Sequence, residues 1–344
     1  MTPSNDPLGL PPETDAEGDE GESGLPAPVC VITFNGQDPS GAGGLAADVA
    51  TISAMGGHAC PVVSCIWVRD TTEVLGHLVL DPEMVVAQAR MLLRDMDISG
   101  FKAGFLGSPE VVRGVSELIA EYPDIPLVVY LPEVLGWEED TTNGYISAVR
   151  EHLIPRAALL SGSHEVLTQF LAEPGQAAPA SGQLPTPSEL ALQAHRMGAS
   201  RLLVTGLASG AHAAGGGSFI DNVLLSVNAD GQVEHGVREQ FERIDMNFIG
   251  TGDTLGAAVA TLLASGTDPN EAVSESLQFL DQSLETGYRL GMGSAIPDRF
   301  FWAVPPDDEG EPGEMPLEAE GEPSEGDVSD ADLALRRQKA KRLH

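Results

Sequence analysis

Apolar segments of strand length alternate with segments of helical periodicity along most of the chain. Short, mainly apolar runs predict strands at 28–34, 61–68, 127–131, 157–160 and 201–205. Apolar residues at helical intervals predict helices at 45–55, 82–96, 252–265 and 270–290. The apolar stretch 104–106 is followed by Ser108-Pro109-Glu110, which has the cap, first-turn proline and acid of a helix start.

The later part of the chain changes to a different pattern. Segments 218–227 and 233–241 are separated by Asn-Ala-Asp-Gly, which predicts a β-hairpin with an Asp-Gly turn. Strand–helix alternation followed by a hairpin predicts an α/β fold with a mostly parallel central sheet covered on both faces. Asn35-Gly36 directly after the first strand predicts a turn at that point.

Both ends of the chain differ in composition from the middle. Residues 1–27 and 305–335 are rich in acids, proline, glycine and serine and poor in aromatics, which predicts disordered tails. The second tail, 305–344, ends in the basic run RRQKAKR. One domain is therefore expected over 28–304, with a mobile Pro/Ala/Gly/Gln loop at 174–187.

Charge excludes some classes of function. The chain carries 52 acids and 18 bases, and residues 28–304 alone keep 33 acids and 13 bases. Such a surface repels phosphate backbones and anionic lipids, so neither nucleic acid nor membrane is an expected partner. No apolar run is long enough for a membrane span, and the acidic, proline-rich start is unlike a signal peptide. Three cysteines without metal spacing add to the expectation of a cytoplasmic protein.

Two glycine-rich segments carry the candidate chemistry. The first, NGQDPSGAGG at 35–44, follows the first predicted strand and precedes a helix containing Asp48. The second, FIGTGDTLGAA at 248–258, would present consecutive backbone N–H groups at a helix N-terminus, which favours developing phosphate charge. Asp253 in this first turn is placed to accept a proton from a hydroxyl, although it would serve equally as a helix cap. No P-loop motif occurs in the sequence.

These two motifs, in this order, resemble the ribokinase-like superfamily, and within it the hydroxymethylpyrimidine/phosphomethylpyrimidine kinases of thiamine synthesis. The segments FKAGFLGS and LLVTG extend the resemblance over residues 28–303. It implies a three-layer α/β/α sandwich, transfer of the γ-phosphoryl group of ATP with Mg²⁺ to a pyrimidine alcohol or its monophosphate, and a homodimer.

The resemblance also implies roles for individual residues. Asp253 matches the catalytic base, a position at which many pyrimidine kinases carry Cys. The other matched positions are an anion hole (Gly250, Thr251 and Gly252), substrate contacts (Gly36, Gly43, Asp48, Arg69 and Phe105), nucleotide contacts (Thr205 and Gly206) and a metal ligand (Glu165).

Three departures from the family pattern keep other functions open. Arg69 stands where the family has a pyrimidine-reading Gln, and an arginine donates hydrogen bonds without accepting any. Leu131 replaces an acid near the expected metal, and Gly162 replaces an Asn. The alternatives are a pyridoxal- or pyridoxine-type kinase and a catalytically weak ligand-binding paralogue. Lys102, the single lysine within 28–304, is expected either on the surface or at the site, tethering anionic substrate or ordering the floor.

Overall fold

The strands of the chain form one sheet. The structure, a computed structural model, describes residues 27–134, 139–172, 184–212 and 218–303. Within these ranges nine strands are hydrogen-bonded in the order β3-β2-β1-β4-β5-β6-β7-β8-β9. The strands are β1 (Cys30–Gln37), β2 (His58–Arg69), β3 (Val74–Val79), β4 (Ile98–Ala103), β5 (Leu127–Tyr130), β6 (Leu159–Ser163), β7 (Arg201–His212), β8 (Ser218–Val227) and β9 (Val233–Glu242).

The middle of this sheet is parallel and its edges are antiparallel. The neighbouring strands β2-β1-β4-β5-β6-β7 pair in parallel. At one edge β3 runs antiparallel to β2, and at the other β8 and β9 continue antiparallel from β7. The predicted mostly parallel sheet is therefore confirmed. The predicted hairpin is confirmed too, because β8 and β9 are joined through Asn228–Gly231 with Val227 opposite Val233.

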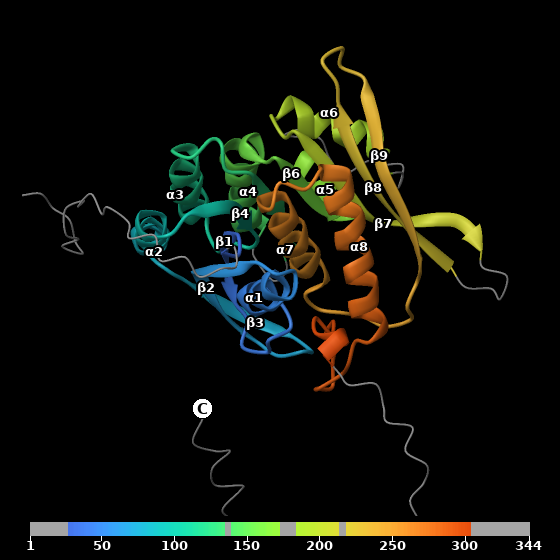
Figure 1. Cartoon of the computed structure of the whole chain (residues 1–344), viewed down its shortest axis with the longest axis horizontal. Coiled ribbons are helices and arrows are strands. Elements are labelled where there is room, and N and C mark those ends of the chain that lie inside the picture. Colours follow the sequence, from blue (N-terminus) through green and yellow to red (C-terminus); the bar gives the residue numbers. More distant parts are fainter. Residues whose placement is uncertain (1–26, 135–138, 173–183, 213–217, 304–344) are drawn as a thin grey trace, which may run out of the picture. The chain divides into compact units, whose positions relative to one another are not determined.

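Helices cover both faces of the sheet (Figure 1). One layer holds α1 (Gly44–Ala54), α7 (Thr251–Ala264) and α8 (Pro269–Glu285). The other holds α2 (Pro82–Asp95), α3 (Pro109–Ala120), α4 (Glu139–Ala148), α5 (His164–Leu171) and α6 (Pro187–Arg196), with a π-helical turn at Val149–Leu153 and a 3₁₀ turn at Ile154–Arg156. A further 3₁₀ turn, Phe301–Ala303, packs against Phe279 of α8. This is the predicted three-layer α/β/α arrangement.

Strand side chains fill two separate cores, one on each face. On β5, Val128 packs with Leu255 and Val259 of α7, whereas the adjacent Val129 belongs to the core shared with α2–α6. Successive residues of a strand point to opposite faces, so a strand buried on both sides must be apolar throughout. This is why the parallel strands appear in the sequence as unbroken apolar runs.

Helix starts agree well with the sequence. The Ser108 side chain accepts a hydrogen bond from the Val111 N–H at the start of α3, as predicted. Asp81 and Asp268 cap α2 and α8 in the same way, each directly before a proline. Within the described ranges, no helix combines the length and the apolar character that a membrane crossing requires.

Several expectations differ from the structure. Asn35-Gly36 is not a turn: β1 continues through Gln37, with a register shift against β2 at this point. The edge strand β3 and the helices α4, α5 and α6 were not predicted from the pattern. The predicted mobile loop lies largely outside the described residues, which resume at 184 and enter α6 through the cap Thr186. The predicted tails also lie almost wholly outside the described residues, so the domain boundaries stay predictions.

Candidate active site

The two glycine-rich segments meet where β1 ends and α7 begins. β1 leads into the turn before α1, and α7 starts at Thr251 after its cap residue Gly250. Both elements are held on the same sheet, because α7 packs against β1, β4 and β5. Residues more than 200 positions apart in the sequence are thereby brought into hydrogen-bonding contact, as in the 2.8 Å bond from Asn35 Nδ2 to Asp253 Oδ1.

Asp253 is held by donors from three elements. Its Oδ1 accepts hydrogen bonds from Asn35 Nδ2 and from Lys102 Nζ, both at 2.8 Å. Its Oδ2 accepts a bond of 2.9 Å from the backbone N–H of Gly44. The side chain keeps 14% of its surface exposed. Asp253 is therefore a fixed carboxylate with access to solvent, and its predicted role as a base is compatible with this geometry.

Asp48 lies behind Asp253 and is fully buried. Its Oδ1 accepts from Lys102 Nζ at 2.7 Å, and its Oδ2 accepts from the Thr33 hydroxyl and from Asn35. Both oxygens are thus engaged inside the protein. The structure places Asp48 in a buried charge cluster, and its substrate contact stays a prediction.

Burial and the Lys102 ammonium act in opposite directions on the two carboxyl groups. Burial alone would raise the pKa of Asp253, but the Lys102 charge and the three hydrogen bonds outweigh it and hold that pKa below its usual range. Full burial raises the pKa of Asp48 despite the attraction of Lys102. Burial also works against the charge of Lys102, but the two carboxylates raise its pKa overall. At neutral pH Asp253 is therefore the ionised member of the cluster that reaches solvent.

Glycines are required both inside the first segment and where the two segments touch. Gly44 has φ +58°, and a Cβ there would overlap the carbonyl oxygen of Gly36. Gly250 has φ +85°, and a Cβ there would overlap the carbonyl oxygen of Ala42. Buried Arg299 ties the same contact together, since it donates to the Ala42 carbonyl at 2.6 Å and to the Thr254 hydroxyl at 2.9 Å. Only residues without a side chain allow the two loops to approach this closely.

The start of α7 has the form of an anion site. The first backbone bond of the helix runs from Thr254 N–H to the Gly250 carbonyl, so the N–H groups of residues 251–253 precede the helical ladder. The helix dipole adds partial positive charge there. Gly252 leaves room for the ring of Tyr130, which lies where a Cβ would be. This arrangement is what the anion-hole prediction for Gly250, Thr251 and Gly252 requires, and that role stays a prediction.

A cavity of about 580 Å³ opens beside this helix start. Its lining includes Thr251, Gly252 and Tyr130, together with the predicted nucleotide residues Thr205 and Gly206. Apolar side chains also line it, namely Ile220, Phe241, Phe248, Leu277, Leu280 and Leu284. Its volume is that of a typical small-molecule site, and its lining combines polar and apolar residues.

Glu165 also lines this cavity, in the first turn of α5 next to the cap residue Ser163. Among the described residues no group of three or more His, Cys, Asp or Glu side chains converges as a metal site. Magnesium bound with a nucleotide takes most of its ligands from phosphates and water and needs only one or two carboxylates. The single Glu165 carboxylate therefore fits such an ion, and its role stays a prediction.

The remaining predicted substrate residues lie on the other side of Asp253. Gly43 faces a space bordered by two carboxylates: a Cβ there would lie 3.4 Å from both Asp38 Oδ2 and Asp253 Oδ2. Arg69 lies near Asp38, with its Nε 3.8 Å from Asp38 Oδ2. The Arg69 side chain is 18% exposed, and none of these residues lines the 580 Å³ cavity.

Gly36 and Phe105 adjoin a cluster of aromatic rings. The Trp67 ring centroid is 4.6 Å from that of Phe105, and His77 contacts both rings. A Cβ at Gly36 would lie 2.5 Å from Trp67 Nε1. The Trp67 indole therefore occupies the space above Gly36, next to the predicted substrate contacts.

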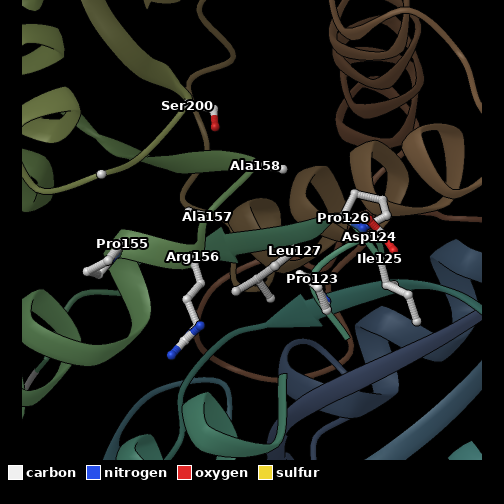
Figure 2. A pocket seen from close by; sticks show the side chains of 11 residues that line it. Pro123, Asp124, Ile125, Pro126, Leu127, Pro155, Arg156, Ala157, Ala158 and Ser200 are labelled. Atoms are coloured by element: carbon white, nitrogen blue, oxygen red, sulfur yellow. The ribbon is translucent and has the colours of Figure 1, made fainter. Parts of the chain in front are cut away.

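A second cavity, of about 310 Å³, lies at the opposite end of the strands, where β5 and β6 begin (Figure 2). Its lining is mainly proline, alanine and backbone, with Asp124 and Arg156 as the charged residues. The Arg156 Nε donates to the Ser116 hydroxyl at 3.0 Å. This cavity is separate from the predicted site residues, since none of them lines it.

Sequence reasoning missed several residues of the site. Asn35 was assigned to a turn, yet it donates to both Asp48 and Asp253 and accepts from the N–H groups of Gly36 and Phe105. Lys102 was flagged by its uniqueness without a definite role. Asp38, Tyr130 and Arg299 were not predicted as site residues. Of these, Asp38 lies inside the first glycine-rich motif, whereas Tyr130 and Arg299 lie in neither motif.

The fold is shared with known vitamin kinases. The structure of an ADP complex of Bacillus subtilis pyridoxal kinase superposes with a TM-score of 0.66 at 21% identity, covering 81% of this chain and all of that one. A phosphomethylpyrimidine kinase from Clostridium difficile superposes with a TM-score of 0.57 at 19% identity, covering 74% of this chain and 99% of that one. The architecture is thus that of ribokinase-like kinases.

Sequence comparison identifies the family. Residues 38–298 match the model of the phosphomethylpyrimidine kinase family, and the chain belongs to this family. A hydroxymethylpyrimidine/phosphomethylpyrimidine kinase of Streptomyces coelicolor is 29% identical over 284 residues, which cover 80% of this chain and 96% of that protein. The Escherichia coli protein of the same name is 26% identical over 273 residues, covering 78% and 95%. The resemblance expected from the two motifs is confirmed.

Proposed function

We propose that the protein transfers the γ-phosphoryl group of ATP to 4-amino-5-hydroxymethyl-2-methylpyrimidine, to its monophosphate, or to both, in thiamine biosynthesis. The observation that carries the proposal is the Asp253 carboxylate, fixed in the first turn of α7 next to free helix N–H groups and a 580 Å³ cavity. Family membership supports the choice of substrate, since the relatives carry this activity in their names.

The residues suggest a division of labour. ATP would lie in the 580 Å³ cavity, with its base against the apolar side chains of the lining and its terminal phosphates toward Thr251 and Gly252. The alcohol would lie on the side of Gly43, where Asp253 Oδ2 takes its proton while the alkoxide oxygen bonds to the γ-phosphorus and the bond to ADP breaks. The α7 N–H groups would stabilise the charge on the transferring group. A magnesium ion, for which Glu165 is the candidate ligand, would supply further charge neutralisation on the phosphates.

The test is an assay of ADP release with the pyrimidine alcohol and, separately, with its monophosphate. Asp253→Asn keeps the shape and removes the base, so kcat is expected to fall by about 10²–10⁴-fold with each substrate the enzyme accepts. The control is Asp124→Asn at the opposite end of the strands, which is expected to leave kcat unchanged. Full activity of Asp253→Asn would reject the assigned base. Absence of product from both substrates would reject the proposed reaction.

The other two functions raised by the sequence predict different experimental results. Likeness to pyridoxal kinases is below 25% identity and speaks only for the fold. A higher kcat/KM for pyridoxine than for the pyrimidine would nevertheless replace the proposal. A catalytically weak binding protein would bind the pyrimidine in calorimetry and give no phosphorylated product in a single-turnover experiment.

We further propose that the protein is a cytoplasmic homodimer. The three cysteines are unpaired thiols, as expected in a reducing compartment. The β2–β3 hairpin forms one edge of the sheet and exposes an apolar edge patch of Ile66, Val68 and Leu78. An exposed edge strand with apolar side chains favours pairing with a second copy about a two-fold axis.

Light scattering after gel filtration tests this assembly. Leu78→Glu is expected to produce monomers, whereas Met91→Glu, an exposed apolar position on α2, is expected to leave the mass unchanged. A wild-type protein that elutes as a monomer at micromolar concentration would reject the dimer.

A further inference from the structure

Lys102 is a fully buried lysine between two carboxylates. It is fully buried on β4, between Thr33 of β1 and Val128 of β5. Its side chain passes Gly256 of α7, where a Cβ would lie 3.5 Å from Lys102 Cε. Lysine is almost never fully buried without a partner, and two carboxylates meet it here, Asp48 at 2.7 Å and Asp253 at 2.8 Å.

Stability alone does not account for this cluster. Removing three charges from water is expensive, and replacing a buried ion pair by apolar side chains is often neutral or stabilising. The surrounding sheet face is apolar and offers such packing through Val31, Val128 and Leu255. The position of the ammonium against the carboxylate assigned as the base is therefore better explained by a function.

The hydrogen bonds around Asp253 distinguish its two oxygens. Oδ1 accepts from Lys102 and from Asn35, which fills the two acceptor sites of one carboxylate oxygen. Oδ2 accepts from the Gly44 N–H and borders the space in front of Gly43. Oδ2 therefore accepts one hydrogen bond fewer than Oδ1 among the described residues and has an acceptor site left for a substrate hydroxyl.

We propose that Lys102, anchored by Asp48, is a positioning residue that holds Oδ1 of Asp253, so that Oδ2 is the atom that takes the proton from the substrate. This inference rests on the proposed phosphoryl transfer and adds two residues to it. Asp48 acts through Lys102 and does not touch substrate. Lys102 keeps Asp253 ionised, and Asp48 limits that effect because its own negative charge offsets part of the ammonium.

Opposite responses to two substitutions follow from this arrangement. The charged or titratable groups facing Asp253 are Lys102 of β4, Asp48 of α1, Asp38 after β1, Tyr130 of β5 and Arg299 before the last turn. Lys102→Met removes the nearest positive charge, so the pKa of Asp253 rises. Asp48→Asn removes a negative charge from Lys102, so the pKa of Asp253 falls. A base acts when deprotonated, so a higher pKa moves the acid limb of kcat/KM to higher pH.

The experiment measures this pKa in two ways in the full-length protein. The first is the acid limb of kcat/KM, and the second is a ¹³C NMR titration of Asp carboxyl carbons, in which the Asp253 signal is identified by its loss in Asp253→Asn. Relative to wild type, Lys102→Met is expected to shift both readouts upward by about one pH unit or more, and Asp48→Asn to shift them downward. In Lys102→Met, kcat at pH 7 is expected to fall by about 10–100-fold, with KM for ATP changed much less.

A charge-balanced variant covers the case in which Lys102→Met fails to fold. Lys102→Met/Asp48→Asn removes one charge of each sign and leaves Asn35 and Gly44 to hold Asp253. It is expected to fold and to titrate at higher pH than wild type. Equal Asp253 titration in wild type and this variant, or shifts in the same direction for the two single variants, would overturn the proposal. If wild type shows no turnover on the pyrimidines, the proposed function fails, while the NMR titration still tests Lys102.

Discussion

Replacing Gly250 by alanine tests the contact between the two glycine-rich loops. Gly250 has φ +85°, and an added Cβ would overlap the Ala42 carbonyl oxygen, which is backbone and is also held by Arg299. Gly41 provides a matched control, because its φ is +73° and no atom lies within 4 Å of an added Cβ. Both substitutions force alanine into the left-handed region, at a cost of about 1–2 kcal/mol. Only Gly250→Ala also requires the backbone to move.

The difference in unfolding free energy between the two variants measures the cost of disturbing the contact between Gly250 and the Ala42 carbonyl. Overpacking adds about 1–3 kcal/mol, so Gly250→Ala is expected to lose about 2–5 kcal/mol of unfolding free energy in total. In urea, with slopes of about 1–3 kcal/mol/M, its midpoint should lie about 1 M below that of Gly41→Ala. Because the α7 N–H groups are displaced, kcat should fall by about 10²-fold. Equal midpoints and equal kcat for the two variants would show that the loops do not meet as described.

Three further substitutions address single contacts of the site. Arg299→Met leaves the Ala42 carbonyl without its buried donor and is expected to lower the free energy of unfolding by about 1–3 kcal/mol in urea titration; an unchanged midpoint would contradict the bridge. Tyr130→Phe removes a hydroxyl beside the start of α7, and burial, with nearby Asp253, Glu133 and Asp48, keeps that group protonated by raising its pKa. Because Tyr130 lines the 580 Å³ cavity, we expect its hydroxyl to donate a hydrogen bond to a phosphate of bound ATP. In Tyr130→Phe, kcat should then fall by about tenfold or more with the melting temperature nearly unchanged, and wild-type kcat would refute this contact. Glu165→Gln is expected to raise the Mg²⁺ concentration for half-maximal activity by about tenfold, and EDTA to stop turnover; identical Mg²⁺ curves would reject Glu165 as a ligand.

The sequence predicts the parallel sheet because its strands are buried on both faces and must be apolar throughout. The hairpin is equally clear, since its Asp-Gly turn is a local signal. β3 gives no such signal: Val74–Val79 contains Gly76 and His77, lies at the edge, and carries a register shift against β2. Its formation depends on pairing with β2, which no local pattern reports.

The residues of the candidate site also fall into those that a local pattern predicts and those that depend on distant partners. Glycines and a helix-start acid are local features, so Gly250, Gly252 and Asp253 are accessible from the sequence. The role of Asn35 is not, because its partners Asp48 and Asp253 come from distant segments and an Asn-Gly pair most often marks a turn. The motif position of Asp48 is likewise visible in the sequence, whereas its buried ion pair with Lys102 is not.

The bridge from Arg299 to the Ala42 carbonyl spans 257 residues. A growing polypeptide can complete most of its sheet long before this contact is possible, because Arg299 comes after the last strand and both closing helices. Phosphoryl transfer is therefore expected to begin during synthesis only after the segment that carries Arg299 has left the ribosome. Proteolytic clipping just before Arg299 is likewise expected to lower activity while leaving the nine described strands in place, so that activity reports on this late contact and not on the presence of the sheet.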